Sequence, residues 1–159
     1  MAAGQTHIMA AYVQWMALNN PADKWGTDTI KLALVTSSLT PSITDSNPCW
    51  GAGGAQNYST NEVTAGGNYT AGGVTLAGTT VTIAGAVVSL NATSPSSWAA
   101  NASNPTTARW GIIYDSSTTN KEVLGYLDLG AVTSLVPGLQ INWNGVSSGT
   151  QPILQGTAT

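Results

Sequence analysis

Beyond residue 28, apolar and polar side chains alternate with a period of two in several short segments, which is the pattern of half-buried β-strands. The alternation is clearest in residues 29–35, where Ile30, Leu32 and Leu34 form one apolar face. Glycine and proline turn signals separate further apolar segments, which predict short strands at 68–70, 74–76, 81–83, 87–90, 109–114, 123–129, 139–143 and 153–154. This succession without βαβ alternation predicts an all-β fold, a jelly-roll-like β-sandwich.

The first segment has a helical period instead. Its apolar residues recur at i, i+4, i+7 and i+8, the spacing of one helical face: Ile8, Tyr12, Trp15 and Met16. Thr6 is a suitable N-cap, and Pro21 ends the helix because proline disfavours helical backbone in the residue before it. The helix contains no Asp, Glu, Lys or Arg, and two interpretations of its neutral outer face stay open. It lies over the end of its own sheet, or it is shared with a neighbouring subunit.

The chain has 159 residues, the size of one domain. We predict residues 1–20 to be the N-terminal helix and residues 21–159 to be a single β-sandwich domain with a long loop at about 39–60. Loops of this length in a compact domain tend to be functional or to embrace a partner. Trp50 lies in the loop, and it either anchors the loop on the core or protrudes to be buried by something else.

Charge is scarce, and its scarcity excludes several functions. Lys and Arg total 4, Asp and Glu total 7, and charged residues make up 7% of the chain, against about 25% in a typical soluble domain. Four scattered cations cannot form the basic surface that phosphate backbones require, so we expect no nucleic-acid partner. No stretch approaches the roughly 18 apolar residues of a membrane span, and residues 1–18 lack the pattern of a signal peptide, so we expect neither a membrane partner nor export.

The sequence offers little for catalysis or metal binding. His7 is the only histidine and Cys49 the only cysteine, too few for a histidine- and cysteine-based metal site or for an internal disulfide. The predicted helix cap beside His7 favours a structural histidine over a catalytic base. We therefore predict no catalytic residues, no metal and no cofactor.

Glycoside hydrolysis would need a pair of acidic residues that face each other across a cleft. Asp23 with Asp28, and Asp115 with Glu122, are each local to one loop or turn, and residues 115–120 read as a hairpin loop. Asp128 alternates out of an apolar run and is predicted to face solvent or to lie on an edge strand. These positions do not predict an acid–base pair.

Tryptophan is the abundant aromatic residue, with six copies. Trp110 and Trp143 alternate with apolar neighbours and are predicted to be buried. The candidate interface consists of aromatic residues on the helix and in loop-like segments: Tyr12, Trp15, Trp25, Trp50 and Trp98. Indole stacks on sugars and is frequent in protein interfaces. The alternative is that each loop tryptophan anchors its own loop.

Four motifs carry a resemblance to a known group of proteins. They are NEVTAGGNY at 61–69, RWGIIYD at 109–115, LGYLDLG at 124–130 and LQINWN at 139–144. In order and spacing the chain resembles a group of small virion proteins of tailed bacteriophages. The resemblance implies a β-sandwich or jelly-roll structural protein without catalytic residues, often a decoration (cement) protein of the head and sometimes a tail protein. The chain departs from that pattern in its longer, tryptophan-bearing loop between Leu39 and Thr60.

The resemblance and the composition lead to one expectation. We expect a non-enzymatic decoration subunit that binds and stabilises the major capsid protein shell, located on the virion head surface and, during assembly, in the host cytoplasm. We also expect it to bind copies of itself, as a trimer slightly more than as a dimer. The alternatives are a tail or fibre protein and a virion module that binds host-surface carbohydrate.

Overall fold

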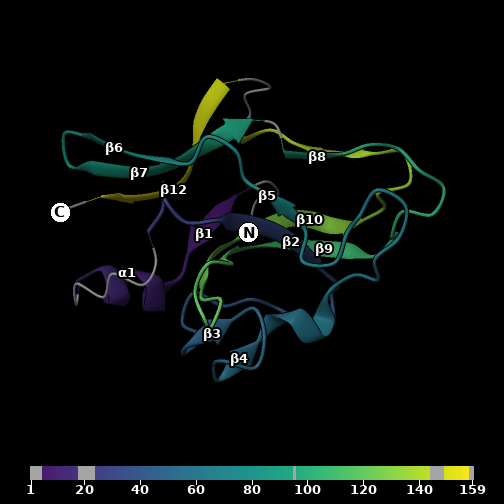
Figure 1. Ribbon diagram of the computed structural model, residues 1–159, viewed down its shortest axis with the longest axis horizontal. Helices are drawn as coiled ribbons and strands as arrows, with labels where there is room; N and C mark the ends of the chain where they lie inside the picture. Colours follow the sequence, from purple (N-terminus) through teal and green to yellow (C-terminus); the bar gives the residue numbers. More distant parts are fainter. Residues whose placement is uncertain (1–4, 18–23, 95, 144–148, 158–159) are drawn as a thin grey trace.

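Strands are the main regular structure of the molecule and pair antiparallel except for β3–β4, and one α-helix lies near the N-terminus (Figure 1). The computed structural model describes residues 5–17, 24–94, 96–143 and 149–157. In chain order the elements are β1 (Thr6–Ile8), α1 (Ala10–Ala17), β2 (Ile30–Val35), β3 (Pro48–Cys49), β4 (Gln56–Asn57), the 3-10 helix η1 (Tyr58–Asn61), β5 (Val74–Thr75), β6 (Thr80–Ala84), β7 (Val87–Ser94), β8 (Ser96–Trp98), β9 (Ala108–Asp115), β10 (Val123–Thr133), β11 (Leu139–Ile141) and β12 (Gly149–Thr157). The predicted fold class, an all-β sandwich with one N-terminal helix, is confirmed.

The largest sheet has five strands in the order β1-β10-β9-β2-β5. Adjacent strands of this sheet pair antiparallel, and β9 lies at the centre between β10 and β2. All residues of β9 except Arg109 are buried, which means that both faces of this strand are covered. A strand covered on both faces needs a nearly continuous apolar run, and this explains the unbroken run from Trp110 to Tyr114.

A second layer consists of a three-stranded sheet in the order β12-β7-β6 and of the β11–β8 pair. Figure 1 shows this layer along the upper side of the molecule and the five-stranded sheet below it. Contact between the layers is close at Gly125 of β10, because a Cβ added there would lie 2.8 Å from the Leu154 side chain of β12. Leu154 itself is 1% exposed. The core therefore lies between the two layers.

The N-terminal helix is shorter than predicted, since residues 6–8 form a strand. In β1, Thr6 pairs with Leu127 and Ile8 with Gly125 of β10. The edge of the sheet supplies hydrogen-bond partners for this backbone, and β-branched residues suit a strand. The helix α1 begins only at Ala10, and the predicted helix end at 19–21 lies outside the described residues.

Three other predictions about elements need correction. Residues 68–70 are not an edge strand, because Gly66 and Tyr69 exchange two backbone hydrogen bonds of 3.0 Å and close a tight turn. The sequence predicts no strand between residues 91 and 107, but this stretch contains the end of β7 and all of β8. The long loop at about 39–60 contains the short parallel pair β3–β4 and the 3-10 helix. Local sequence does not show these features, because a strand can pair with a strand distant in sequence and a tight turn can depend on the backbone freedom of glycine.

Among the described helices, none has the length and apolar character that crossing a bilayer requires.

Candidate functional site

Four of the five predicted interface residues are buried in the core of this chain. Tyr12 is 2% exposed, and Trp25, Trp50 and Trp98 are each 5% exposed. The three loop tryptophans therefore anchor their own loops, which was the alternative interpretation, and they present no indole face to a partner. Trp15 is different, because it is only partly buried.

Specific contacts hold the loop tryptophans in place. The Trp50 ring stacks on Tyr114 of β9 with centroids 4.9 Å apart and an interplanar angle of 13°. The Trp25 indole N–H donates to the Asn91 carbonyl at 2.8 Å, and Trp98 lies against Tyr69 with centroids 5.9 Å apart. A large apolar ring with a satisfied N–H is stable in a core, so these loops are bound to the sandwich at fixed points.

Trp15 lines a groove between α1 and the loop after Pro41. The groove has a volume of about 520 Å³, and its other wall consists of residues 44–47. Within that wall, Asp45 accepts a hydrogen bond from the Tyr58 hydroxyl. The pKa of Tyr58 is raised, mainly by burial and secondly by this hydrogen bond. Trp15 is thus the one predicted interface residue that the structure places at an accessible surface.

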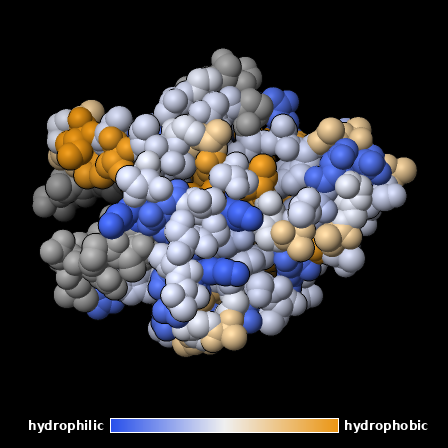
Figure 2. Space-filling model, viewed as in Figure 1, coloured by the Kyte–Doolittle hydropathy of each residue, from blue (hydrophilic) through white to orange (hydrophobic). Residues whose placement is uncertain are grey.

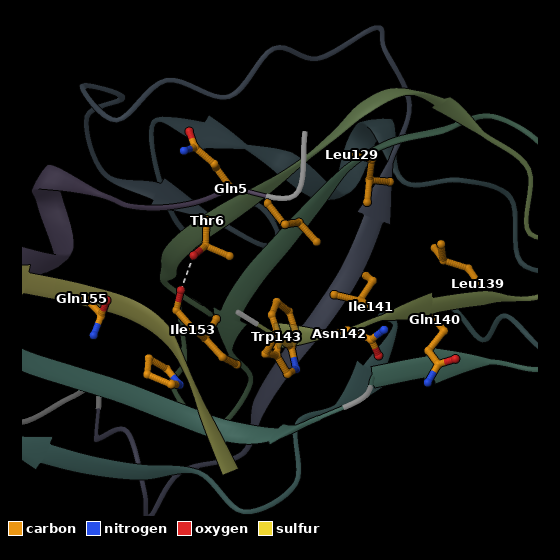
Figure 3. A pocket seen from close by; sticks show the side chains of 12 residues that line it. Gln5, Thr6, Leu129, Leu139, Gln140, Ile141, Asn142, Trp143, Ile153 and Gln155 are labelled. Atoms are coloured by element: carbon orange, nitrogen blue, oxygen red, sulfur yellow. Dashed lines mark hydrogen bonds between the residues drawn. The ribbon is translucent and has the colours of Figure 1, made fainter. Parts of the chain in front are cut away.

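A second cavity, of about 530 Å³, lies between the two layers (Figure 3). One wall comes from β1 and β10, the other from β11, β12 and Trp143. The Thr6 hydroxyl donates to the Ile153 carbonyl and links the two walls. The lining holds no charged residue: Gln5, Thr6, Leu127, Leu129, Leu139, Gln140, Ile141, Asn142, Trp143, Pro152, Ile153 and Gln155. Amide groups and aliphatic side chains can bind a neutral polar ligand, but they supply no group for acid–base chemistry.

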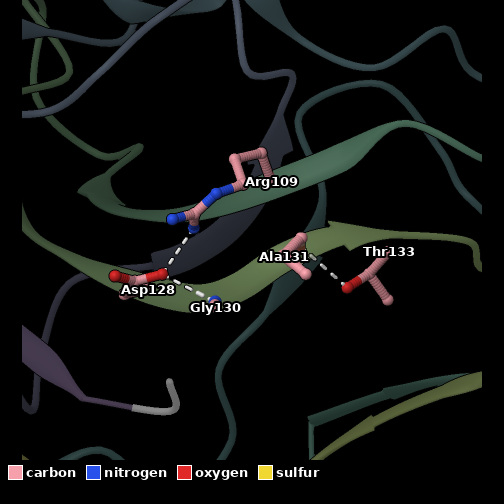
Figure 4. Close-up of polar contacts among 5 residues, drawn as sticks. All are labelled: Arg109, Asp128, Gly130, Ala131 and Thr133. Carbon is pink, nitrogen blue, oxygen red and sulfur yellow. Dashed lines mark hydrogen bonds and ion pairs between the residues drawn. The ribbon is translucent and has the colours of Figure 1, made fainter. Parts of the chain in front are cut away.

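Asp128 is buried on β10, which lies between β1 and β9, and this corrects the prediction that it faces solvent or lies on an edge strand. It accepts hydrogen bonds from the Arg109 guanidinium and from the Gly130 N–H, the latter at 2.6 Å (Figure 4). The side chains of Asp128 and Arg109 are 3% and 19% exposed. Burial acts to raise the pKa of Asp128, but the two hydrogen bonds and the Arg109 charge outweigh it and hold the pKa below its usual range. The pair is a structural ion pair, and Arg109 also lies 3.8 Å from the centroid of the Trp110 ring.

Asp115 is another buried acid, at 0% exposure. Its Oδ1 accepts the Ser117 N–H at 2.7 Å, while its Oδ2 has no hydrogen-bond partner. Burial, together with the nearby Asp28 carboxylate, outweighs the Ser117 hydrogen bonds and raises the pKa of Asp115 from 3.8 to about 6. Glu122, the acid nearest to Asp115 in this loop's sequence, accepts a hydrogen bond from Thr118 within the same hairpin loop. The hairpin-loop interpretation of 115–120 agrees with these contacts.

Asp115→Asn is expected to stabilise the protein at high pH. Because the folded pKa of Asp115 lies above the unfolded value, the carboxylate destabilises the fold progressively as the pH rises through about 4 to 6. The amide can keep the Ser117 contact and donate toward Asp28. Urea unfolding should show a gain of about 1–3 kcal/mol near pH 8 and almost none near pH 4. A variant that is less stable than the parent near pH 8 would contradict the assignment.

The remaining candidate groups are His7, Cys49 and Asp23. His7 lies in β1 and stacks on Tyr126 with centroids 4.8 Å apart, and Cys49 is buried and forms no disulfide. Asp23 lies outside the described residues. Within the described ranges, no three His, Cys, Asp or Glu side chains are grouped as a metal site would need.

The β6–β7 hairpin is a surface feature that the sequence analysis did not identify. All five residues of β6 are exposed, with Ile83 at 74%, Val81 at 49% and, on β7, Val88 at 40%. Figure 2 shows apolar side chains gathered at the tip of this hairpin, on the left of the molecule. It lies inside residues 63–108, a stretch without a single Asp, Glu, Lys, Arg or His. The length of this uncharged stretch is the sequence signal that could have predicted the surface.

Comparison with family models, with curated proteins and with solved structures gives no match for this chain.

Proposed function

We propose that this protein is a non-enzymatic structural subunit of a tailed-phage virion, a decoration protein that binds and stabilises the major capsid protein shell. The observation that supports this most is the uncharged, partly apolar surface formed by residues 63–108 and centred on the β6–β7 hairpin. The motifs that resemble small phage virion proteins provide the link to a virion. The long loops, bound to the core by buried tryptophans, give a rigid body suited to repeated attachment.

Neutral contacts suit attachment in many copies. A decoration subunit binds the same surface at symmetry-related positions of a shell, and apolar and amide contacts do not depend on ion pairing that salt would screen. Among the described residues, the β6–β7 hairpin and the groove at Trp15 are two surfaces that suit such contacts. Copies of this chain and the major capsid protein are the partners that this proposal names.

The test is co-sedimentation of the purified protein with empty capsids of the parent phage. We expect binding in a fixed ratio to the capsid protein, changed by less than about twofold between roughly 0.1 M and 1 M salt, because Debye screening acts on charges and not on apolar contact. Lack of co-sedimentation at either salt concentration would overturn the proposal. Binding that disappears at high salt would show an ionic attachment and contradict its physical basis.

A second candidate function is binding of neutral host carbohydrate, and the cavity between the two layers (Figure 3) favours it. The volume of about 530 Å³ suits a small ligand, and exposed Gln5, Gln140 and Asn142 offer amide hydrogen bonds. The buried loop tryptophans count against it, because they offer no stacking surface. Calorimetry with host polysaccharide separates this candidate from the first. Carbohydrate binding requires that the parent protein binds the polysaccharide and that Gln140→Ala weakens the binding.

A further inference from the structure

We propose that the outer edge of β6 is the surface at which two copies of this chain pair, forming one continuous sheet across a two-fold axis. This inference deepens the self-association within the proposed function and rests on it. In the sheet order β12-β7-β6, strand β6 is terminal, and no described strand pairs with its outer side. An unpaired edge presents a row of backbone donors and acceptors that another strand can use.

The hairpin geometry shows which backbone groups point outward. Ala84 and Val87 flank the two-residue turn, whose first residue, Gly85, has φ +59° as a type II′ turn requires. The pair that closes such a turn exchanges both hydrogen bonds, and hydrogen-bonded pairs then alternate along the ladder. The N–H and C=O groups of Thr82 therefore point to β7, whereas those of Val81 and Ile83 point to the outer edge.

A second β6 fits this edge in one symmetric register. With Thr82 facing its own copy on the axis, Val81 of one copy lies opposite Ile83 of the other, and both are outward-pointing residues. Each of the two Val81–Ile83 pairs exchanges two backbone hydrogen bonds. Other registers centred on Val81 or Ile83 leave fewer of the outward groups of this five-residue strand paired.

The same register joins the exposed apolar side chains into one patch. Val81, Ile83 and Val88 lie on one face of the hairpin, because Ile83 is paired with Val88 and side chains two residues apart share a face. That face continues inward to Leu90, which is 4% exposed. Across the axis the valines and isoleucines of the two copies become neighbours, so the patch doubles in length and loses exposure to water.

Charge and strand regularity favour a second copy as the occupant. A two-fold interface uses the same patch on both copies, so a patch with charge of one sign would repel itself, but residues 63–108 contain no charge to repel. Native edge strands usually avoid pairing through charged side chains, proline or bulges. β6 has none of these: its sequence is TVTIA, and its register with β7 is regular throughout.

The first experiment measures the mass of the purified full chain by sedimentation equilibrium. We expect twice 16.2 kDa for the parent and an increase of at least 100-fold in the dimer dissociation constant for Ile83→Lys. Val81→Pro should have the same effect by removing an outward N–H, a change that edge strands tolerate. Val132→Lys is the matched control, since Val132 is 54% exposed but lies on β10 in the other sheet, and it should stay dimeric.

The second experiment tests the register directly. Thr82→Cys should form an interchain disulfide under mild oxidation, because a residue on the axis of an antiparallel pair meets its own copy within the Cα separation that disulfides span. Thr75→Cys, exposed on β5, should not.

A monomer at all concentrations, a trimer, or a dimer that survives Ile83→Lys would overturn the inference. A monomer that still co-sediments with capsids would overturn this inference and leave the proposed function standing, while a β6-paired dimer that ignores capsids would do the reverse.

Discussion

Arg109→Met is expected to lower the free energy of unfolding by about 3–5 kcal/mol near pH 7. The substitution removes the positive charge beside the Asp128 carboxylate, which is 3% exposed. Of the two hydrogen bonds to Asp128 in Figure 4, the one from the Gly130 N–H remains. A buried charge that loses its counter-ion keeps its full desolvation cost. Urea unfolding followed by tryptophan fluorescence measures the loss.

Two controls separate the charge effect from lost packing. The double variant Arg109→Met, Asp128→Leu should recover most of the stability, because an apolar pair replaces the ion pair. The stabilising effect of ionised Asp128 is present above its unfolded pKa and is lost as the pH falls through its lowered folded pKa. The difference between parent and Arg109→Met should therefore shrink below about pH 4. A loss under about 1 kcal/mol near pH 7 would contradict the buried ion pair.

Trp50→Ala is expected to cost about 3–5 kcal/mol of unfolding free energy. The ring is 5% exposed and stacks on Tyr114, so its removal leaves a cavity between the long loop and β9. At temperatures where the variant remains folded, its binding to capsids should equal that of the parent. Equilibrium unfolding and co-sedimentation measured on one preparation test both parts.

Trp15→Ala is the comparison for Trp50→Ala, since Trp15 is partly buried and lines the groove beside α1. Its cost in stability should be lower, below about 2 kcal/mol. Unchanged stability of Trp50→Ala together with lost capsid binding would show that Trp50 is a partner contact after all, and would contradict the assignment of this side chain to the core.

Local pattern was sufficient for the main strands of the fold. The period-two alternation at residues 30–35 and the apolar runs at 109–114 and 123–129 correspond to β2, β9 and β10, because side-chain alternation is a direct consequence of strand geometry. The same local signals could not distinguish strand from helix at Thr6, where the deciding partner is Leu127, far along the chain.

The surface and the buried polar groups depended on tertiary contacts. Burial of Asp128 requires Arg109 on the neighbouring strand, and burial of Trp50 requires the face of Tyr114. Neither contact leaves a mark in the local sequence. The alternation of Val81 and Ile83 predicted a strand correctly. A period of two, however, gives no information on whether the apolar face of the strand is covered by the rest of the chain.

The most direct test of the central claim is a symmetric reconstruction of the virion at a resolution that shows strands. The account predicts density for this sandwich on the outer surface of the head, repeated at symmetry-related positions and in contact with the major capsid protein. Density for the subunit in the tail, or its absence from purified virions, would contradict it.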